Sequence, residues 1–329
     1  MFRTMRGTIA AFLMGALTVG VSPRVAHGGQ DFPDHPVKLV VASPAGSSSD
    51  VLSRKLANEL GAKWKQPVVV ENVVGLGGII GAEKVAKQAP DGYTLLVGTI
   101  SAMSVGRSLM KLPYDPTKDF EPVTLGMSMP NLLVVHPSVP AKTLEELIAY
   151  AKQNPGKLRY GHPGVGTTPH LSAELLNEMT GMQMEAIPYK SSAQMATDLL
   201  AGHYEVLFHN SSVMMPYVQS GAARPLAVTS AERVSTLPNI PTVAESGKLK
   251  GFVVNAWWGI HVPAGTPPDI VAKLNTDFNA ALAQPDIRKW VEEQGGSVGG
   301  GTPQALFALQ ESEAKKWGDL IKKLNVKNP

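Results

Sequence analysis

The chain alternates short β-branched runs with amphipathic segments along most of its length, and this pattern restricts its fold more than any other feature. A strand-like run over 37–41 precedes a helix-like segment over 51–60, and the same rhythm returns from residue 143 onward with a helix expected over 144–153. Such alternation is typical of βαβ units on a mostly parallel sheet flanked by helices. We therefore predict an α/β fold.

Two strand-to-helix junctions carry polar, glycine-containing loops. The first reads Ser-Pro-Ala-Gly-Ser-Ser-Ser-Asp over 43–50, and the second reads Gly-His-Pro-Gly-Val-Gly-Thr-Thr-Pro-His over 161–170. The first N–H groups of a helix have no partner inside the helix, and ligands of α/β proteins bind at the carboxyl ends of strands. The pattern predicts an anion clamp built from both loops, although serines at such positions also serve simply as helix caps.

Two apolar, strand-like stretches over 130–137 and 253–260 separate the halves of the chain. They predict two lobes joined by two crossing strands. Residues 29–130 and 255–329 would form a discontinuous first lobe, and residues 131–254 the second. The last part of the first lobe would hold three helices that begin near Pro268, Pro285 and Pro303, because proline fits the first turn of a helix.

The N-terminus carries Arg3 and Arg6, then an apolar run over 9–21 and small residues over 26–29. This order indicates a secretory signal peptide over 1–28 and an exported protein; the alternative, a retained anchor, fits less well because the run is short for a membrane span. Cleavage would leave 27 basic and 27 acidic residues. A neutral mature chain without a basic patch predicts no nucleic-acid partner.

The sequence also argues against several kinds of chemistry. Cysteine is absent, which excludes a thiol nucleophile and a disulfide framework. Ser312-Glu-Ala-Lys315 matches an acyl-enzyme motif but lacks its partner motifs. The glycine-rich segment over 70–81 lacks dinucleotide-binding spacing because Ile80 stands where the third glycine belongs, so we interpret it as a tight turn before a helix. The histidines are scattered rather than spaced as metal ligands. We expect no cofactor, no metal and no catalytic residue.

The junctions and the motifs between them resemble the Bug-type periplasmic solute-binding proteins of tripartite tricarboxylate transporters. The matching stretches run in the family's order and include Pro44–Asp50, Val68–Asn72, Gly77–Glu83, Ala89–Leu95, Leu112–Pro116, Ile187–Lys190, Leu226–Ser230, Leu237–Val243 and Pro263–Pro267. The resemblance implies a monomeric, two-lobed protein that closes on a carboxylate metabolite and delivers it to membrane subunits of a transporter. A ligand sensor for a membrane kinase and a secreted hydrolase remain alternatives.

The resemblance also carries the site onto this sequence. The carboxylate contacts would be Ala45, Gly46, Ser47, Ser48 and Ser49 in the first lobe, Gly164, Val165, Gly166, Thr167 and Thr168 in the second, and a side wall of Thr99 and Ser101. The chain departs from the family at Ser47, at His162-Pro163 and at His209, which stands where the family has an aspartate. We hypothesise that His162 and His209 accept a second anionic group. Asn210 and Trp257 complete the predicted contacts. Trp257 and Trp258 are consecutive in the second strand-like stretch, so we expect one to face the cleft and the other the core. Either tryptophan would favour an aromatic dicarboxylate.

Overall fold

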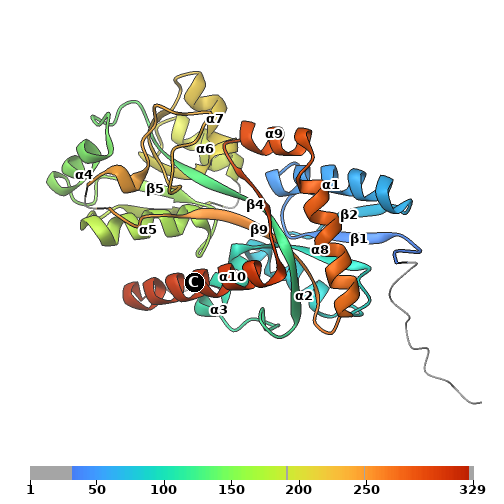
Figure 1. The fold of residues 1–329 in the computed structure, drawn as a ribbon. Coiled ribbons are helices and arrows are strands. Elements are labelled where there is room, and N and C mark those ends of the chain that lie inside the picture. The colour runs from blue at the N-terminus through green and yellow to red at the C-terminus, as the bar shows by residue number, and fades with distance from the viewer. Residues whose placement is uncertain (1–31, 190–191, 248, 326–329) are drawn as a thin grey trace, which may run out of the picture.

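The structure, a computed structural model, describes residues 32–189, 192–247 and 249–325. The helices and strands fall into two groups, with two long strands running between them (Figure 1). The predicted signal peptide over 1–28 lies outside the described residues. Within those ranges the structure contains no helix whose length and apolar character would let it cross a membrane.

The first group is built from two separate parts of the chain. Its N-terminal part contains β1 (Val37–Val41), α1 (Ser48–Trp64), β2 (Val68–Asn72), the 3₁₀ turn η1 (Leu76–Gly78), α2 (Ile79–Ala86), β3 (Thr94–Thr99), the π-helical turn η2 (Ser101–Val105) and α3 (Gly106–Leu109). Its C-terminal part contains β9 (Asn255–Pro263), α8 (Pro268–Leu282), α9 (Pro285–Glu293), β10 (Ser297–Gly300) and α10 (Pro303–Leu324).

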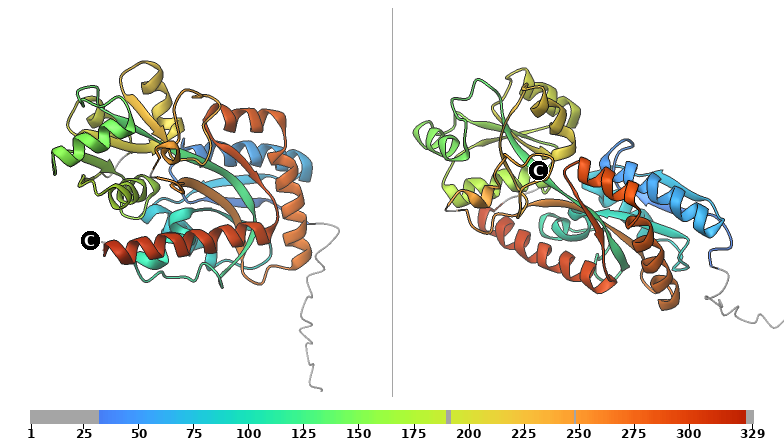
Figure 2. Two further views of the ribbon diagram at one scale, coloured as in Figure 1. Left: turned by 60° about the vertical axis from the view of Figure 1, so that its left-hand side comes forward. Right: turned by 45° about the horizontal axis from the view of Figure 1, so that its top comes forward.

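The second group is continuous in sequence and follows β4 (Phe120–Val135), the longest strand. It contains α4 (Leu144–Gln153), β5 (Arg159–His162), α5 (Thr168–Thr180), β6 (Glu185–Pro188), α6 (Ser192–Leu200), β7 (Val206–Asn210), α7 (Ser211–Gln219), β8 (Arg224–Val228) and the 3₁₀ turn η3 (Val243–Glu245). Figure 2 shows this green-to-yellow group beside the blue, cyan, orange and red elements of the first.

The strands pair in the order β2-β1-β3-β9-β4-β7-β5-β6, and β8 and β10 also pair with β4. Pairing is parallel within β2-β1-β3 and within β6-β5-β7, as the βαβ pattern predicts. Every pairing made by β4 and β9 is antiparallel. The antiparallel pairs therefore belong to the two strands that connect the lobes.

The path of β4 shows how the lobes are joined. Residues 120–130 of β4 pair with β9, whereas residues 131–135 pair with β7 and β8 in the other lobe. The chain returns through β9, whose preceding residue Val254 donates its N–H to the carbonyl of Thr229 in the second lobe. The fold is thus two-lobed with two crossing strands. The exact boundaries at 130/131 and 254/255 stay a prediction.

Local sequence explains where several helices begin. Thr143 and Thr302 cap α4 and α10, because their hydroxyls accept the N–H groups of Glu146 and Ala305. Proline stands in the first turn of α8, α9 and α10, which confirms the predicted starts near Pro268, Pro285 and Pro303.

Candidate functional site

A cavity of about 610 Å³ lies between the lobes at the carboxyl ends of β3 and β7. Both lobes and the crossing strand β9 contribute to its wall. The predicted contacts that line it are Thr99, Ser101, Thr167, Thr168, His209, Asn210 and Trp257. Its volume suits a small metabolite, since ligand pockets commonly measure about 300–1,000 Å³.

The other predicted contacts lie next to this cavity. Gly164, Val165 and Gly166 line an adjoining cavity of about 380 Å³. The predicted contacts that line neither cavity are Ala45, Gly46, Ser47, Ser48, Ser49 and His162. From the first junction loop, Ser43 and Pro44 reach the wall of the main cavity instead.

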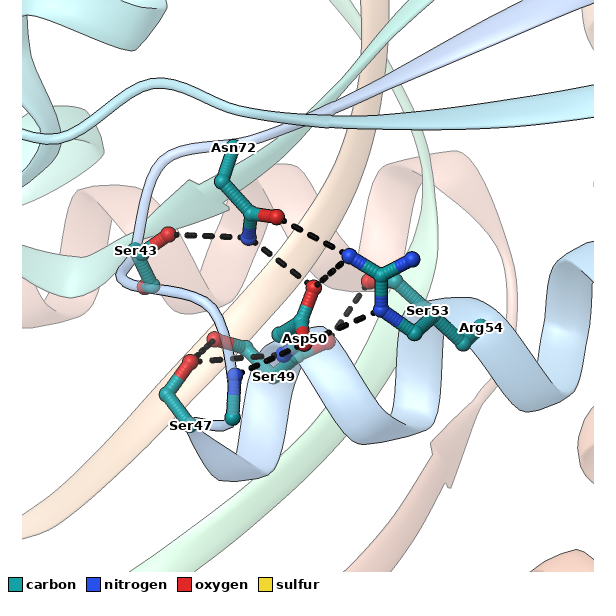
Figure 3. Close-up of polar contacts among 8 residues, drawn as sticks. Ser43, Ser47, Ser49, Asp50, Ser53, Arg54 and Asn72 are labelled. Carbon is teal, nitrogen blue, oxygen red and sulfur yellow. Dashed lines mark hydrogen bonds and ion pairs between the residues drawn. The ribbon is translucent and has the colours of Figure 1, made fainter.

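The side chain of Asp50 accepts hydrogen bonds that fix the first junction loop (Figure 3). Its Oδ2 accepts the N–H of Gly46 at 2.8 Å and Nε of Arg54 at 3.1 Å, and its Oδ1 accepts Nδ2 of Asn72 at 2.9 Å. The same Nδ2 also donates to the carbonyl of Ser43 at 3.1 Å. The network therefore fixes the part of the loop that faces the cavity.

Serine hydroxyls in this loop are largely used within the protein. Ser47 is the N-cap of α1, and its hydroxyl accepts the N–H of Asp50. Ser49 is fully buried, and its hydroxyl lies 3.2 Å from that of Ser47. Helix capping thus explains part of the serine run.

The second junction loop presents the start of α5 to the cavity. Thr167 is the N-cap residue of α5, and its hydroxyl donates to the carbonyl of Gly164 at 2.7 Å instead of capping the helix. Thr167, Thr168 and Pro169 all line the cavity. Because the first N–H groups of a helix lack partners within the helix, the positive end of the α5 dipole lies at the cavity wall.

His162 supports this loop rather than lining the cavity. Its Nδ1 accepts the N–H of Gly164 at 3.2 Å, and its ring lies 4.8 Å from that of His170. Burial lowers the pKa of His162, and burial together with the charge of His162 lowers the pKa of His170 to about 4. Both imidazoles are therefore neutral at pH 7.

His209 is the most exceptional side chain of the wall. It lies on β7 with only 5% of its surface exposed, and neither ring nitrogen has a hydrogen-bond partner among the described residues. Burial lowers its pKa to about 4. A neutral imidazole has one donor and one acceptor nitrogen, so His209 keeps both for another group.

Trp257 and Trp258 occupy consecutive positions of β9 and both contribute to the cavity wall. We predicted that one would face the cleft and the other the core. Their rings pack into different core clusters on opposite faces of the sheet, and both also reach the cavity. Nε1 of Trp257 is buried without a hydrogen-bond partner in the described part of the chain.

The two lobes contact each other around the cavity. The hydroxyl of Ser101 donates to the carbonyl of Gly166 at 3.1 Å, and the hydroxyls of Ser48 and Ser212 lie 3.0 Å apart. The first contact joins the predicted side wall to the second junction loop, and the second joins the start of α1 to that of α7. The residues of both loops are thereby brought to one cleft.

Sequence reasoning missed the loop over 74–78. Val74, Gly75, Gly77 and Gly78 line the main cavity, although we interpreted their segment only as a tight turn before a helix. A Cβ on Gly78 would lie 2.9 Å from Oγ1 of Thr99 and 3.0 Å from the carbonyl oxygen of Ala42, so this close approach requires glycine. The run of glycines was the available signal.

The cavity wall carries no formal charge, since none of the described residues that line it is Asp, Glu, Lys or Arg. Within residues 32–189, 192–247 and 249–325, no cluster of three or more His, Asp or Glu side chains could hold a metal ion. The chemistry on offer is hydrogen bonding by amides, hydroxyls, imidazole and indole.

Two α/β lobes, two crossing strands and a cavity between the lobes define the class of two-lobed solute-binding proteins. A family model described as the tripartite tricarboxylate transporter family receptor (TctC) matches residues 52–326. The chain belongs to this family.

Relatives and solved structures agree with that assignment. Protein BugT of Bordetella pertussis is 35% identical over 312 residues, covering 94% of this chain and 95% of that protein. The R. palustris protein Rpa4515 with adipate has a TM-score of 0.82 at 38% identity, covering 90% of this chain and 99% of that one. MatC from Rhodopseudomonas palustris with bound malate has a TM-score of 0.78 at 33% identity, covering 88% and 100%.

Proposed function

We propose that this chain is a periplasmic receptor that captures a dicarboxylate metabolite, including aromatic ones, between its lobes. The loaded receptor delivers the ligand to membrane subunits of a tripartite tricarboxylate transporter. Support comes from the family and from relatives whose structures contain adipate and malate. On this proposal the protein binds its ligand without converting it, after export with a signal peptide that is then removed.

The observation that carries the proposal is an uncharged cavity whose wall holds buried, unused hydrogen-bonding groups from both lobes. The α5 N-terminus favours an anion, because its first residues line the cavity and the start of a helix carries unpaired N–H groups and the positive end of the helix dipole. One carboxylate of the ligand binds there, beside the hydroxyls of Thr168 and Ser101.

His209 and Trp257 receive the second polar group of the ligand. Leaving a buried donor or acceptor unpaired costs about 1–3 kcal/mol, and a ligand that pairs the imidazole and the indole N–H removes this cost. An aspartate at position 209 would repel an anion, whereas a neutral imidazole donates to it. The chain is therefore suited to a second carboxylate rather than to an amino group.

The lobes close because the ligand contacts both of them. A ligand shifts such an equilibrium only by its preference for one state, and hinge closure is the known behaviour of periplasmic binding proteins. The contacts Ser101–Gly166 and Ser48–Ser212 belong to the closed form on this view.

The test is a thermal-shift screen of the purified mature protein against mono-, di- and tricarboxylates, including aromatic ones, followed by isothermal titration of the hits. Stabilisation follows mass action, with about 2.7 kcal/mol at a ligand concentration of 100 Kd. We expect dicarboxylates to bind and chromogenic esters to show no turnover. Tight binding of an amino acid, with no binding of any dicarboxylate, would overturn the proposal.

A pair of histidine variants sharpens this test. His209→Phe keeps a ring but removes both nitrogens, and we expect it to weaken dicarboxylate binding about tenfold or more. His203→Phe is the matched control, because the side chain of His203 is 67% exposed and does not line the cavity. Equal loss in both variants would contradict the role of His209.

A further inference from the structure

The 380 Å³ cavity beside the main one, here called the annex, shares part of its wall with it. The two cavities share four lining residues, Gly77, Ser101, Pro163 and Thr167. The remaining wall of the annex is largely apolar and includes Leu76, Ile79, Val105, Leu109, Val165 and Tyr189. A ligand in the main cavity therefore lies next to an apolar compartment.

Both lobes are needed to build the annex. Leu76, Val105 and Leu109 belong to the first lobe, whereas Val165 and Tyr189 belong to the second. At the seam the lobes touch closely, since a Cβ on Gly166 would lie only 2.3 Å from Cδ1 of Leu109. An apolar group in the annex would thus gain its full contact only when the lobes are closed.

Leu76 lines the annex, and both its backbone conformation and its exposure are unfavourable in the protein without a ligand. Its φ of 48° is left-handed, a conformation that is strained for a non-glycine residue. Its apolar side chain is nevertheless 59% exposed, and the neighbouring Val74 is 54% exposed at the main cavity. Strain that holds apolar surface at the entrance of a cavity indicates a functional constraint.

The annex offers a carboxylate no charged side chain among its described lining residues. None of its described lining residues is ionised at pH 7, because Tyr189 is the only titratable one. Burial and a hydrogen bond with Asp198 raise the pKa of Tyr189 to about 12, so its phenol is neutral and already engaged. A second acid group would lose its hydration there, and its only charge-compensating partners would be backbone N–H groups of the loop over 164–166.

We propose that the ligand carries an apolar branch, alkyl or aryl, which occupies the annex while its acid groups occupy the main cavity. This inference rests on the proposed function and narrows the ligand class to branched or substituted dicarboxylates. Compact, unbranched acids would fill only the main cavity.

Isothermal titration of the full mature protein tests the branch. The probes are succinate, glutarate and adipate, each beside its 2-methyl and 2-propyl derivatives. We expect the Kd to fall about fourfold for each added methylene, since each buried methylene contributes about 0.8 kcal/mol. The heat capacity of binding should become more negative along the same series, as apolar burial requires.

Leu76→Asn tests whether the apolar branch lies in the annex. Asparagine tolerates the left-handed φ and replaces an apolar lining side chain with a polar one. We expect the gain per methylene to fall to about twofold or less; the readout is the ratio of substituted to unsubstituted Kd within each variant. Leu76→Gly, which also fits this φ, provides a second variant. Val69→Asn is the control, since Val69 is 51% exposed and lines neither cavity.

The outcomes separate the two proposals. If the unsubstituted acids bind but their 2-propyl derivatives bind equally or more weakly, the annex inference is wrong and the receptor function stands. If the gain persists in both Leu76 variants, the branch lies elsewhere and the inference also fails. If no parent and no derivative binds, the proposed function itself fails.

Discussion

Replacing Asp50 with asparagine tests whether one carboxylate holds the first junction loop. The carboxylate is 4% exposed, and its neighbours are all donors: the N–H of Gly46, Nδ2 of Asn72, and Nε and an Nη of Arg54. An asparagine would turn an N–H₂ group toward at least one of these donors. The change keeps the shape of the side chain and reverses the polarity of one contact.

The magnitude follows from the contacts. Hydrogen bonds to a charged group contribute about 1.5–3 kcal/mol each, and Asp50→Asn weakens all of them and breaks at least one. Arg54 is half exposed and regains water, which limits the loss. We expect the free energy of unfolding at pH 7 to fall by about 2–4 kcal/mol. Ser43 is tethered through Asn72, so ligand affinity should fall roughly fivefold, or about 1 kcal/mol.

Urea denaturation followed by tryptophan fluorescence measures the first effect and isothermal titration the second. Burial by itself would raise the pKa of Asp50, but hydrogen bonds from Arg54, Gly46 and Asn72 outweigh it and leave the pKa below its ordinary 3.8. The stabilisation is therefore present above pH 3.8 and lost at lower pH, so the difference between wild type and variant should shrink there. Asp286→Asn, on a side chain 66% exposed, is the control. A loss below 0.5 kcal/mol for Asp50→Asn would refute the reasoning.

Three further predictions concern closure and pH. Gly166→Ala should weaken ligand binding about fivefold or more by titration, because its methyl meets Leu109 across the cleft; Gly181→Ala, with a similar φ of 73° and no atom within 4 Å, should leave the Kd unchanged. Ser48→Cys with Ser212→Cys should form a disulfide in this cysteine-free chain, and oxidation before ligand addition should abolish binding that reduction restores. As the pH is lowered from 6 to 4.5, the free energy of unfolding measured in urea titrations should fall by about 3 kcal/mol per pH unit. A slope below about 1 kcal/mol per pH unit would contradict this. The cause is three buried imidazoles whose pKa values of about 4 make the unfolded state bind more protons; they are His170, His209 and His261.

The sequence predicted the elements whose signals are local. The helix expected over 144–153 is α4 as observed, because Thr143 supplies a cap and the apolar period is regular. The helix expected from residue 51 begins earlier, at Ser48, because Ser47 is its cap. Signals of this kind need only neighbouring residues, so a sequence can reveal them.

Elements that depend on distant partners were predicted only in part or not at all. The strand expected over 130–137 is β4, which begins ten residues earlier because its first half pairs with β9 and β10. The four-residue strand β10 contains two glycines and has little strand propensity of its own. A Cβ on Gly299 would lie 2.1 Å from the carbonyl oxygen of Leu125, so glycine allows this pairing, and no local pattern shows it.

The features of the candidate site also divide into those that local sequence predicts and those that depend on distant parts of the chain. Helix-start residues such as Thr167 and Thr168 reach the cavity because a βα junction places them at the end of a strand. The unpaired nitrogens of His209 and the left-handed backbone of Leu76 depend on what packs around them. Sequence identified the position of His209 through its departure from the family, but its neutrality follows only from its burial.

An uncharged cavity has a consequence for release. The attraction between two charges falls with the first power of distance, whereas the field of a helix end fades within about one turn. On the proposed function, a dicarboxylate held by the α5 N-terminus, hydroxyls and a neutral imidazole would be bound strongly only while both lobes touch it. When the hinge opens, little long-range attraction remains to hold the anion. A lysine or arginine in the same wall would keep attracting it across the open cleft, which would slow the transfer that a receptor must complete.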